Sequence, residues 1–236
     1  MTTTRSSLGL RSVALFDGLA PERLEALAQV CRWRSLPAGR SLVQRSVRES
    51  DVHFVISGRL RITYFALGGR QLTFREVGAG EHFGELAAID GQPRSADVQT
   101  LEASVIASLD APAFRALLRE VPSVCERVML GLCRLVREVS ERVIDLSTLG
   151  VQNRVHAELL RLAREAGSAG NQARLDPAPT HADMASRIST TREQVTRELN
   201  ALQARGLIGK EGRALLLTDV DQLAQMVALV RGADPA

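Results

Sequence analysis

The chain has 236 residues, of which 45% are hydrophobic and 24% are charged, so its composition is globular and its length suits one or two domains. No apolar run approaches the ~20 residues that cross a bilayer, and no signal-peptide pattern opens the chain, so we expect a cytoplasmic protein without membrane contact. The net charge of +3 and the pI of about 9.1 are compatible with nucleic-acid binding without requiring it.

The cysteines and histidines are too far apart in the sequence to suggest a disulfide framework, a zinc site or a catalytic pair. Cys31, Cys125 and Cys133 are odd in number and widely spaced, which argues against a disulfide framework and against zinc. The four histidines are scattered, and no nucleophile–base pair is evident. We therefore expect no metal and no enzymatic activity.

The first half of the chain predicts one helix and then a small β-domain. The first ten or so residues are expected to be loose, and leucines at helical spacing predict a helix within residues 15–30 that begins at Asp17 or Pro21. From Arg34 to Leu109, short alternating segments cut by glycine predict a sandwich or barrel. "SGR" (57–59) and "LGGR" (67–70) are interpreted as hairpin turns.

A long helix is predicted from Pro122 to Leu149, with Gly150 as a stop or bend. Its apolar residues repeat every three and four positions, interrupted once by Arg142, whose stem can lie along an apolar seam while its head reaches water. Either the helix packs on its own sheet or it forms a coiled coil with a second copy, and the narrow seam favours the coiled coil. The seam residues are Val121, Cys125, Val128, Leu132, Leu135, Val139, Leu146 and Leu149.

The last third of the chain predicts a helix-turn-helix. A helix over 151–166 and a loop over 167–180, with room for one short strand, precede two helices over 182–188 and 191–204. A β-hairpin follows, with its tip at 210–212, and then a closing helix.

The second helix of this pair carries side chains of the kinds that read base edges; a solvated charged helix face is the alternative, and the motif favours DNA. Thr190 or Thr191 suits its N-cap, with Glu193 available for a capping box. Arginine bonds guanine bidentately, and glutamate accepts from cytosine. Val195, Leu199 and Leu202 are expected to face the core. The expected DNA contacts are Thr191, Arg192, Glu193, Thr196 and Arg197.

"FGELAAIDGQPRSADV" (83–98) is suited to one small ligand with a hydroxyl and a phosphate. If 84–89 forms a helical turn, its free N–H groups receive an anion, Arg94 pairs with a phosphate oxygen and Ser95 adds its hydroxyl. Glu85 would accept hydrogen bonds from a sugar hydroxyl. A plain surface ion pair between Glu85 and Arg94 is the alternative, but it has no need of the flanking Gly, Pro and Ser.

That stretch resembles the phosphate-binding cassette of cyclic-nucleotide-binding domains. Together with "STTREQVTREL" (189–199), it makes the chain similar to the CRP/FNR family of bacterial transcription regulators from about residue 14 to about residue 225. The resemblance implies an α+β fold: a cyclic-nucleotide-binding, jelly-roll-like β-roll (12–121), a long dimerisation helix with its hinge near Leu149–Gly150 (122–149), and a winged helix-turn-helix domain (150–236).

The resemblance also implies the ligand and the roles of the site residues. Glu85 would hold the ribose 2′-hydroxyl, and Arg94 and Ser95 the cyclic phosphate. cAMP-responsive members usually have two hydroxyl residues nearest the base, whereas here the first is Val139, so one base contact is missing. cAMP is the favoured ligand, and cGMP is possible. The ligand residues implied are Gly84, Glu85, Leu86, Arg94, Ser95, Ala96, Val139 and Ser140.

The partners implied are a second copy of the chain, double-stranded DNA with GTGA-like palindromic half-sites, and RNA polymerase, through the loop 165–180. Ser189 replaces the glycine common in the family's turn, so a strained or differently capped turn is expected. The expected function is a homodimeric transcription regulator gated by a cyclic nucleotide. A ligand-independent regulator, one that senses another signal, and a nucleotide-sensing subunit of an enzyme remain alternatives.

Overall fold

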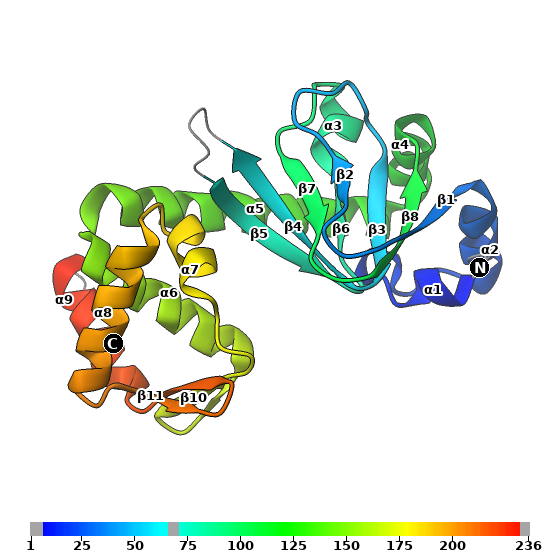
Figure 1. The fold of residues 1–236 in the computed structure, drawn as a ribbon. Helices are drawn as coiled ribbons and strands as arrows, with labels where there is room; N and C mark the ends of the chain where they lie inside the picture. Colours follow the sequence, from blue (N-terminus) through cyan, green and yellow to red (C-terminus); the bar gives the residue numbers. More distant parts are fainter. Residues whose placement is uncertain (1–6, 66–70, 232–236) are drawn as a thin grey trace. The chain divides into compact units, whose positions relative to one another are not determined.

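The computed structural model describes residues 7–65 and 71–231, and the chain divides into two compact units, 1–135 and 136–236. The boundary falls inside the long helix α5 (Pro122–Thr148). Figure 1 shows the first unit as a roll of strands with short helices, and the second as a group of helices with a small sheet.

Two helical segments and a short 3-10 turn precede the roll: α1 (Ser7–Arg11), η1 (Ala14–Phe16) and α2 (Pro21–Val30). Pro21 is the first residue of α2, where its missing N–H costs nothing, so the later of the two expected starts is confirmed. Residues 7–10 were expected to be loose, but they belong to α1, and Leu10 is fully buried in the core of the roll.

The roll consists of two four-stranded sheets, ordered β1-β8-β3-β6 and β2-β7-β4-β5. Neighbouring strands in both sheets pair antiparallel. The strands are β1 (Arg32–Leu36), β2 (Ser41–Val43), β3 (Val52–Ser57), β4 (Arg59–Phe65), β5 (Gln71–Gly78), β6 (His82–Phe83), β7 (Asp97–Thr100) and β8 (Ser104–Leu109).

One of the two expected hairpin turns is wrong. β3 and β4 belong to different sheets, so the "SGR" segment carries the chain from one sheet to the other, and Gly58, with φ 90°, allows that corner. β4 and β5 do pair antiparallel, as the second hairpin requires, but its "LGGR" turn lies outside the described residues.

The cassette segment forms a short helix at one end of the roll (Figure 1). This helix, α3 (Glu85–Asp90), runs between two glycines, and its carbonyl end is held by α4 (Ala111–Glu120), since Arg115 Nη1 donates to the Ala88 carbonyl over 2.7 Å. Asp110 caps α4 by accepting from the Ala113 N–H. Contacts from outside the cassette therefore hold α3 in place.

Helix α5 has 27 residues, about 40 Å, and begins at Pro122 as expected. Its expected seam needs correction. Val128 is buried in the core of the roll, Leu149 is buried in the core of the second unit, and Arg142 donates a hydrogen bond to the Arg187 carbonyl. None of the three is free to line an interface. Apolar side chains exposed at three-, four- and seven-residue intervals are Met129, Val136, Val139, Val143 and Leu146, whereas Leu132 is half-buried and packs against the core of the roll.

The second unit has a core of helices closed by a small sheet, ordered β11-β12-β10-β9. The expected loop after α6 contains two short strands. The tip of the later hairpin lies at Gly212 and Arg213, because Lys210 and Glu211 belong to β11 and pair with residues of β12. The elements are α6 (Val151–Ala166), β9 (Ser168–Ala169), β10 (Gln172–Leu175), α7 (His181–Arg187), α8 (Arg192–Ala204), β11 (Ile208–Glu211), β12 (Ala214–Leu217) and α9 (Val220–Arg231).

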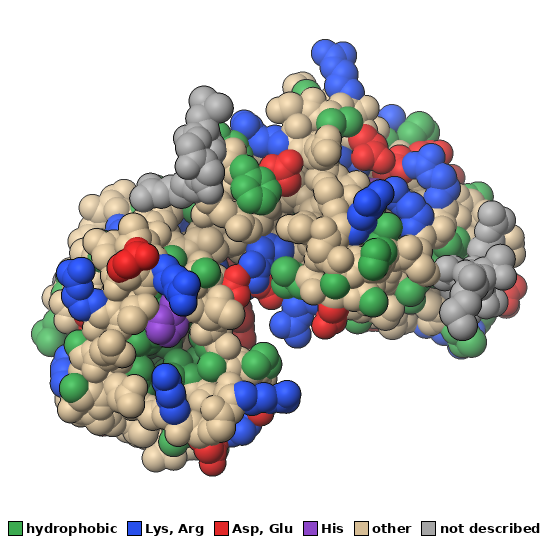
Figure 2. Space-filling view, viewed as in Figure 1, with side chains coloured by type: hydrophobic (Ala, Val, Ile, Leu, Met, Phe, Trp, Pro, Cys, Tyr) green, Lys and Arg blue, Asp and Glu red, His purple; other side chains and the backbone are tan. Residues whose placement is uncertain are grey.

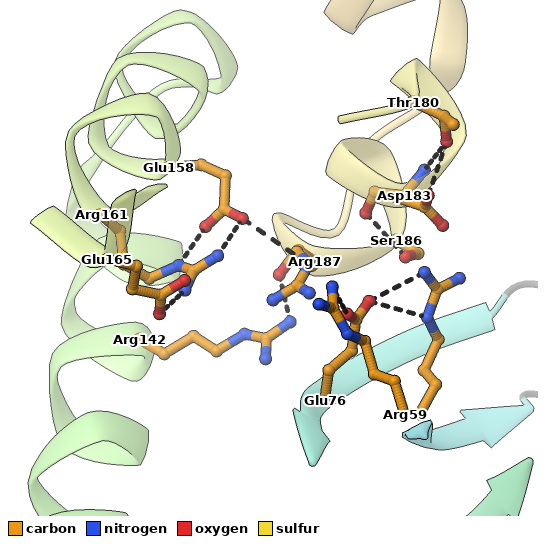
Figure 3. Close-up of polar contacts among 11 residues, drawn as sticks. Arg59, Glu76, Arg142, Glu158, Arg161, Glu165, Thr180, Asp183, Ser186 and Arg187 are labelled. Atoms are coloured by element: carbon orange, nitrogen blue, oxygen red, sulfur yellow. Dashed lines mark hydrogen bonds and ion pairs between the residues drawn. The ribbon is translucent and has the colours of Figure 1, made fainter. Parts of the chain in front are cut away.

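A group of charged side chains ties the end of α5 to this unit (Figure 3). Glu158 is buried and accepts two hydrogen bonds from Arg161, at 2.7 and 2.8 Å, and it also lies 3.8 Å from Arg187 Nε. Arg142 donates to the carbonyl of Arg187, the last residue of α7. Burial lowers the pKa of the Arg142 guanidinium, and the nearby Glu158 carboxylate opposes that shift. The head of Arg142 was expected to reach water; it bonds to α7, and the residue is half-buried.

Candidate functional site

The backbone of the cassette turns at a glycine that no other residue can replace without strain. Gly84 is the N-cap of α3 and has φ 91°, in the left-handed region. A Cβ atom on it would lie 2.5 Å from Arg94 Nη1 and 2.8 Å from the Asp51 carbonyl oxygen. The guanidinium of Arg94 therefore lies directly against the start of α3.

Three acceptors surround this guanidinium. Arg94 Nη1 donates to the Gly84 carbonyl over 3.1 Å, and Nη2 donates to the Asp51 carbonyl over 2.6 Å. Nη2 also lies 3.1 Å from His53 Nε2. Burial lowers the pKa of Arg94, and the carboxylates of Glu49 and Glu85 oppose that shift, so the side chain is still a cation at neutral pH.

Two buried polar atoms beside this turn have no hydrogen-bond partner among the described residues: Glu85 Oε2 and Arg94 Nε. Both side chains are nearly inaccessible, at 7% and 5% exposed. Buried polar groups are rarely left unsatisfied, and such atoms are candidates for ligand contacts. The carboxylate is an acceptor for a hydroxyl, and the guanidinium N–H is a donor to an anion. The donor set therefore fits a small molecule that carries both groups.

Six of the predicted ligand residues lie at α3 and the segment after it. Glu85, Arg94 and Ala96 are buried and Gly84 is half-buried, whereas Leu86 and Ser95 are exposed. The remaining two, Val139 and Ser140, are exposed positions of α5 within the second unit.

Sequence reasoning missed two residues of this site, His53 and Asp51. Both lie at β3, more than 40 positions before Arg94, and their hydrogen bonds to it depend on how the sheets close. A histidine inside the apolar segment "VHFVI" was the available signal, because a fully buried histidine needs polar partners.

The second site lies on α8. Thr191 is its N-cap and accepts from the Gln194 N–H over 3.3 Å, so the N3 position of a capping box belongs to Gln194 and not to Glu193. Val195, Leu199 and Leu202 are buried, as expected. A shallow surface hollow of about 410 Å³ is lined by Arg192, Glu193, Thr196, Arg197 and Asn200.

The outer face of α8 offers both donors and acceptors. Hydrogen bonds from its own backbone N–H and from the Thr191 side chain lower the pKa of Glu193, which keeps its carboxylate ionised. Arg192 and Arg197 both line this hollow, and the positive charge of Arg192 contributes to the lowered pKa of Glu193. Figure 2 shows basic side chains, with an acidic side chain and a histidine among them, over the part of the surface where Figure 1 places α7 and α8. Asn200 was missed, although it lies one turn after Thr196 and Arg197 on the same helix face.

Two family models match the chain in this order: the cyclic nucleotide-binding domain over residues 33–121, and the Crp-like helix-turn-helix domain over residues 153–226. The "Cyclic AMP receptor protein" of Thermus thermophilus is 31% identical over 199 residues, covering 84% of this chain and 89% of that protein. The chain belongs to the CRP/FNR family of transcription regulators. The expected family and fold class are thus confirmed.

Other relatives agree with this assignment. The "CRP-like cAMP-activated global transcriptional regulator" of Mycobacterium tuberculosis is 28% identical over 217 residues, covering 92% of this chain and 97% of that protein. The structure of a CooA mutant from Carboxydothermus hydrogenoformans has a TM-score of 0.76 at 22% identity, covers 86% of this chain and 89% of its own, and shows a shared fold. No helix in the described part of this CRP/FNR regulator is long and apolar enough to cross a membrane.

Proposed function

We propose that this regulator is a cytoplasmic homodimer, without enzymatic activity, whose binding to DNA is gated by a cyclic nucleotide held in the roll. cAMP is the first candidate, because relatives from two organisms are named for it, and cGMP is the second. The observation that carries the proposal is a pair of buried atoms beside Gly84, Glu85 Oε2 and Arg94 Nε, for which the described part of the chain supplies no hydrogen-bond partner.

In this proposal the ribose 2′-hydroxyl donates to Glu85, and the cyclic phosphate accepts from Arg94. Gly84, Leu86, Ser95 and Ala96 lie around the same turn and supply backbone and hydroxyl contacts. Val139 and Ser140 on α5 would approach the base, as the family resemblance implies. No metal is needed, because the guanidinium supplies the charge that the phosphate requires.

The recognition surface is the outer face of α8. Arg192, Glu193 and Arg197 are proposed to read the base edges of a GTGA-like half-site in the major groove, with Thr191 and Thr196 beside them. A dimer would place two such helices about 34 Å apart on a palindromic duplex. Contact with RNA polymerase through residues 165–180 belongs to the same proposal.

Titration calorimetry tests the ligand. Native protein is titrated with cAMP and separately with cGMP, and the titrations are repeated on Arg94→Gln and Glu85→Gln. Each substitution removes a charge-assisted hydrogen bond, so we expect affinity to fall by about tenfold to a hundredfold. Arg40→Gln is the matched control, because it removes the same charge from an exposed position outside the cassette and should leave affinity unchanged.

A duplex with palindromic GTGA half-sites tests the gating by fluorescence anisotropy, with and without the nucleotide that binds. Tighter DNA binding with nucleotide present is the expected result. No binding heat with either nucleotide would overturn the cyclic-nucleotide proposal. Equal DNA binding in both conditions would favour a ligand-independent regulator.

A further inference from the structure

His53 is a fully buried residue of the roll. It lies on β3, directly across from Ser108 in β8 and from Phe83 in β6, and its side chain is fully inaccessible. Its ring lies 4.9 Å from the Phe83 ring, measured between centroids. Neighbours on two adjacent strands thus enclose the ring, and its polar atoms must find partners inside the roll.

Both ring nitrogens have partners. Nδ1 lies 2.8 Å from Ser108 Oγ, and Nε2 lies 3.1 Å from Arg94 Nη2. A guanidinium carries only donors, so Nε2 must be the acceptor in the second contact. The ring proton is then on Nδ1, which donates to the serine hydroxyl. If the ring were protonated on both nitrogens, the N–H at Nε2 would face an N–H of Arg94, and no hydrogen bond could form between them.

The surroundings keep the ring neutral. Burial, followed by the positive charges of Arg94, Arg34 and Arg32, lowers the pKa of His53 to about 3. The acceptor lone pair on Nε2 is therefore available across the whole range in which an ordinary histidine titrates. This histidine acts as a fixed hydrogen-bond acceptor and not as a proton switch.

The consequence falls on Arg94. Nη2 has two N–H bonds, one directed to the Asp51 carbonyl and the other to His53, while Nη1 donates to the Gly84 carbonyl. Three acceptors on two nitrogens fix the plane of the guanidinium. Nε is then the nitrogen left without a partner among the described residues. A side chain held in this way loses little further freedom when it meets an anion.

We propose that His53 is the positioning residue for Arg94: its neutral, Nδ1-protonated ring holds the guanidinium in the orientation that receives the anionic group of the ligand. His53 itself touches no ligand in this proposal. The inference rests on the proposed function, because the anionic group is the cyclic phosphate.

Two substitutions separate the acceptor from the bulk of the ring. His53→Phe keeps an aromatic ring against Phe83 but has no acceptor, whereas His53→Gln places an amide oxygen near the position of Nε2. We expect His53→Phe to weaken cyclic-nucleotide binding by about tenfold or more, because a buried guanidinium N–H loses its partner. His53→Gln should stay within about threefold of native protein, since an acceptor remains.

A double-mutant cycle excludes a merely structural role. In an Arg94→Gln background, His53→Phe should cause no further loss of affinity, because its effect passes through the missing guanidinium. An equal loss in both backgrounds would overturn the proposal, and so would native-like binding by folded His53→Phe. If native protein binds neither nucleotide, the proposed function fails at that step, before any variant is compared.

A measurement without ligand tests the positioning separately. Nitrogen-15 NMR of the histidine rings in native protein should show His53 protonated on Nδ1 and bare on Nε2, unchanged from about pH 5 to about pH 8. A proton on Nε2, or titration within that range, would overturn the inference even if His53→Phe fails to fold.

Discussion

At the scale of single residues, the cassette depends on close approach. Gly84 brings the backbone of α3 within reach of the Arg94 guanidinium. A side chain at this position is excluded both by the positive φ and by the lack of space beside the Cα atom. Gly91, at the other end of the same helix, also has a positive φ of 69°, but a Cβ there would meet no atom within 4 Å. A substitution at Gly91 would therefore cause backbone strain alone, whereas a substitution at Gly84 would cause both backbone strain and steric crowding.

We predict that Gly84→Ala destabilises the roll more than Gly91→Ala does. Each alanine has to adopt a left-handed conformation, which costs about 1–2 kcal/mol. At position 84 the new methyl also meets the Asp51 carbonyl, a backbone atom that cannot move aside cheaply, and such overpacking adds roughly 1–3 kcal/mol. Urea denaturation of both variants measures the difference in the free energy of unfolding. Equal losses of unfolding free energy in the two variants would contradict the prediction, because they would show that the structure accommodates the new methyl group at position 84.

Local patterns predicted the acidic and basic members of the cassette but not their neighbours. Glu85 and Arg94 could be singled out because their flanking small residues are unusual in a short segment. His53 and Asp51 could not be joined to them, since the contacts cross from one strand to a loop distant in sequence. Such contacts depend on the order of strands in the sheets. The alternation of polar and apolar residues along one strand does not reveal that order.

At the scale of elements, helices were predicted more closely than the arrangement of strands. The span of α6 matches its expected range, and α8 begins one residue later than expected, because Thr191 is its cap. The strand after "SGR" was assigned to the wrong neighbour, because a glycine turn alone does not tell a hairpin from a corner between sheets. Three residues of the expected α5 seam are engaged elsewhere: Val128 packs in the core of the roll, Leu149 packs in the core of the second unit, and Arg142 bonds to α7.

The turn between α7 and α8 stores a small strain. Ser189 has φ 55°, a left-handed conformation that suits glycine, so the expected strain at this position is confirmed. The Thr190 N–H donates to the Ala185 carbonyl across this turn, which fixes the conformation in spite of that cost.

We predict that Ser189→Gly raises the stability of the second unit by up to about 1 kcal/mol, because relief of the left-handed strain outweighs the added flexibility of the unfolded chain. Gln203→Gly is the control: it lies exposed in α8 and should lower stability by about 1 kcal/mol. The midpoint of thermal unfolding is the measurement. A lower midpoint for Ser189→Gly would show that the serine side chain stabilises the turn.

At the scale of the whole molecule, the apolar face of α5 is the proposed contact with a second copy. Val136 is 64% exposed and Val143 is 56% exposed, seven positions apart on one face. Exposed valines at heptad spacing are typical of a helix whose partner belongs to another chain.

We predict that Val136→Glu combined with Val143→Glu converts the dimer to a monomer. Two carboxylates would face their copies across the seam, and like charges in an interface cost several kcal/mol, roughly 3 or more. Arg137→Glu is the matched control, because it adds a carboxylate to an exposed position beside the seam. Light scattering after size-exclusion chromatography gives the mass of each protein. A native protein that is already monomeric would contradict the homodimer.

The bond from Arg142 to the end of α7 has a mechanical consequence. With Leu149 in the core of the second unit and Asp145 paired with Arg231 of α9, the last turns of α5 are fastened at three points to the unit that carries α8. Leu149, the first residue of the expected hinge at 149–150, is thus held in the core of that unit. We expect a rotation of α5 near Val139 to be transmitted to the recognition helix through these three contacts.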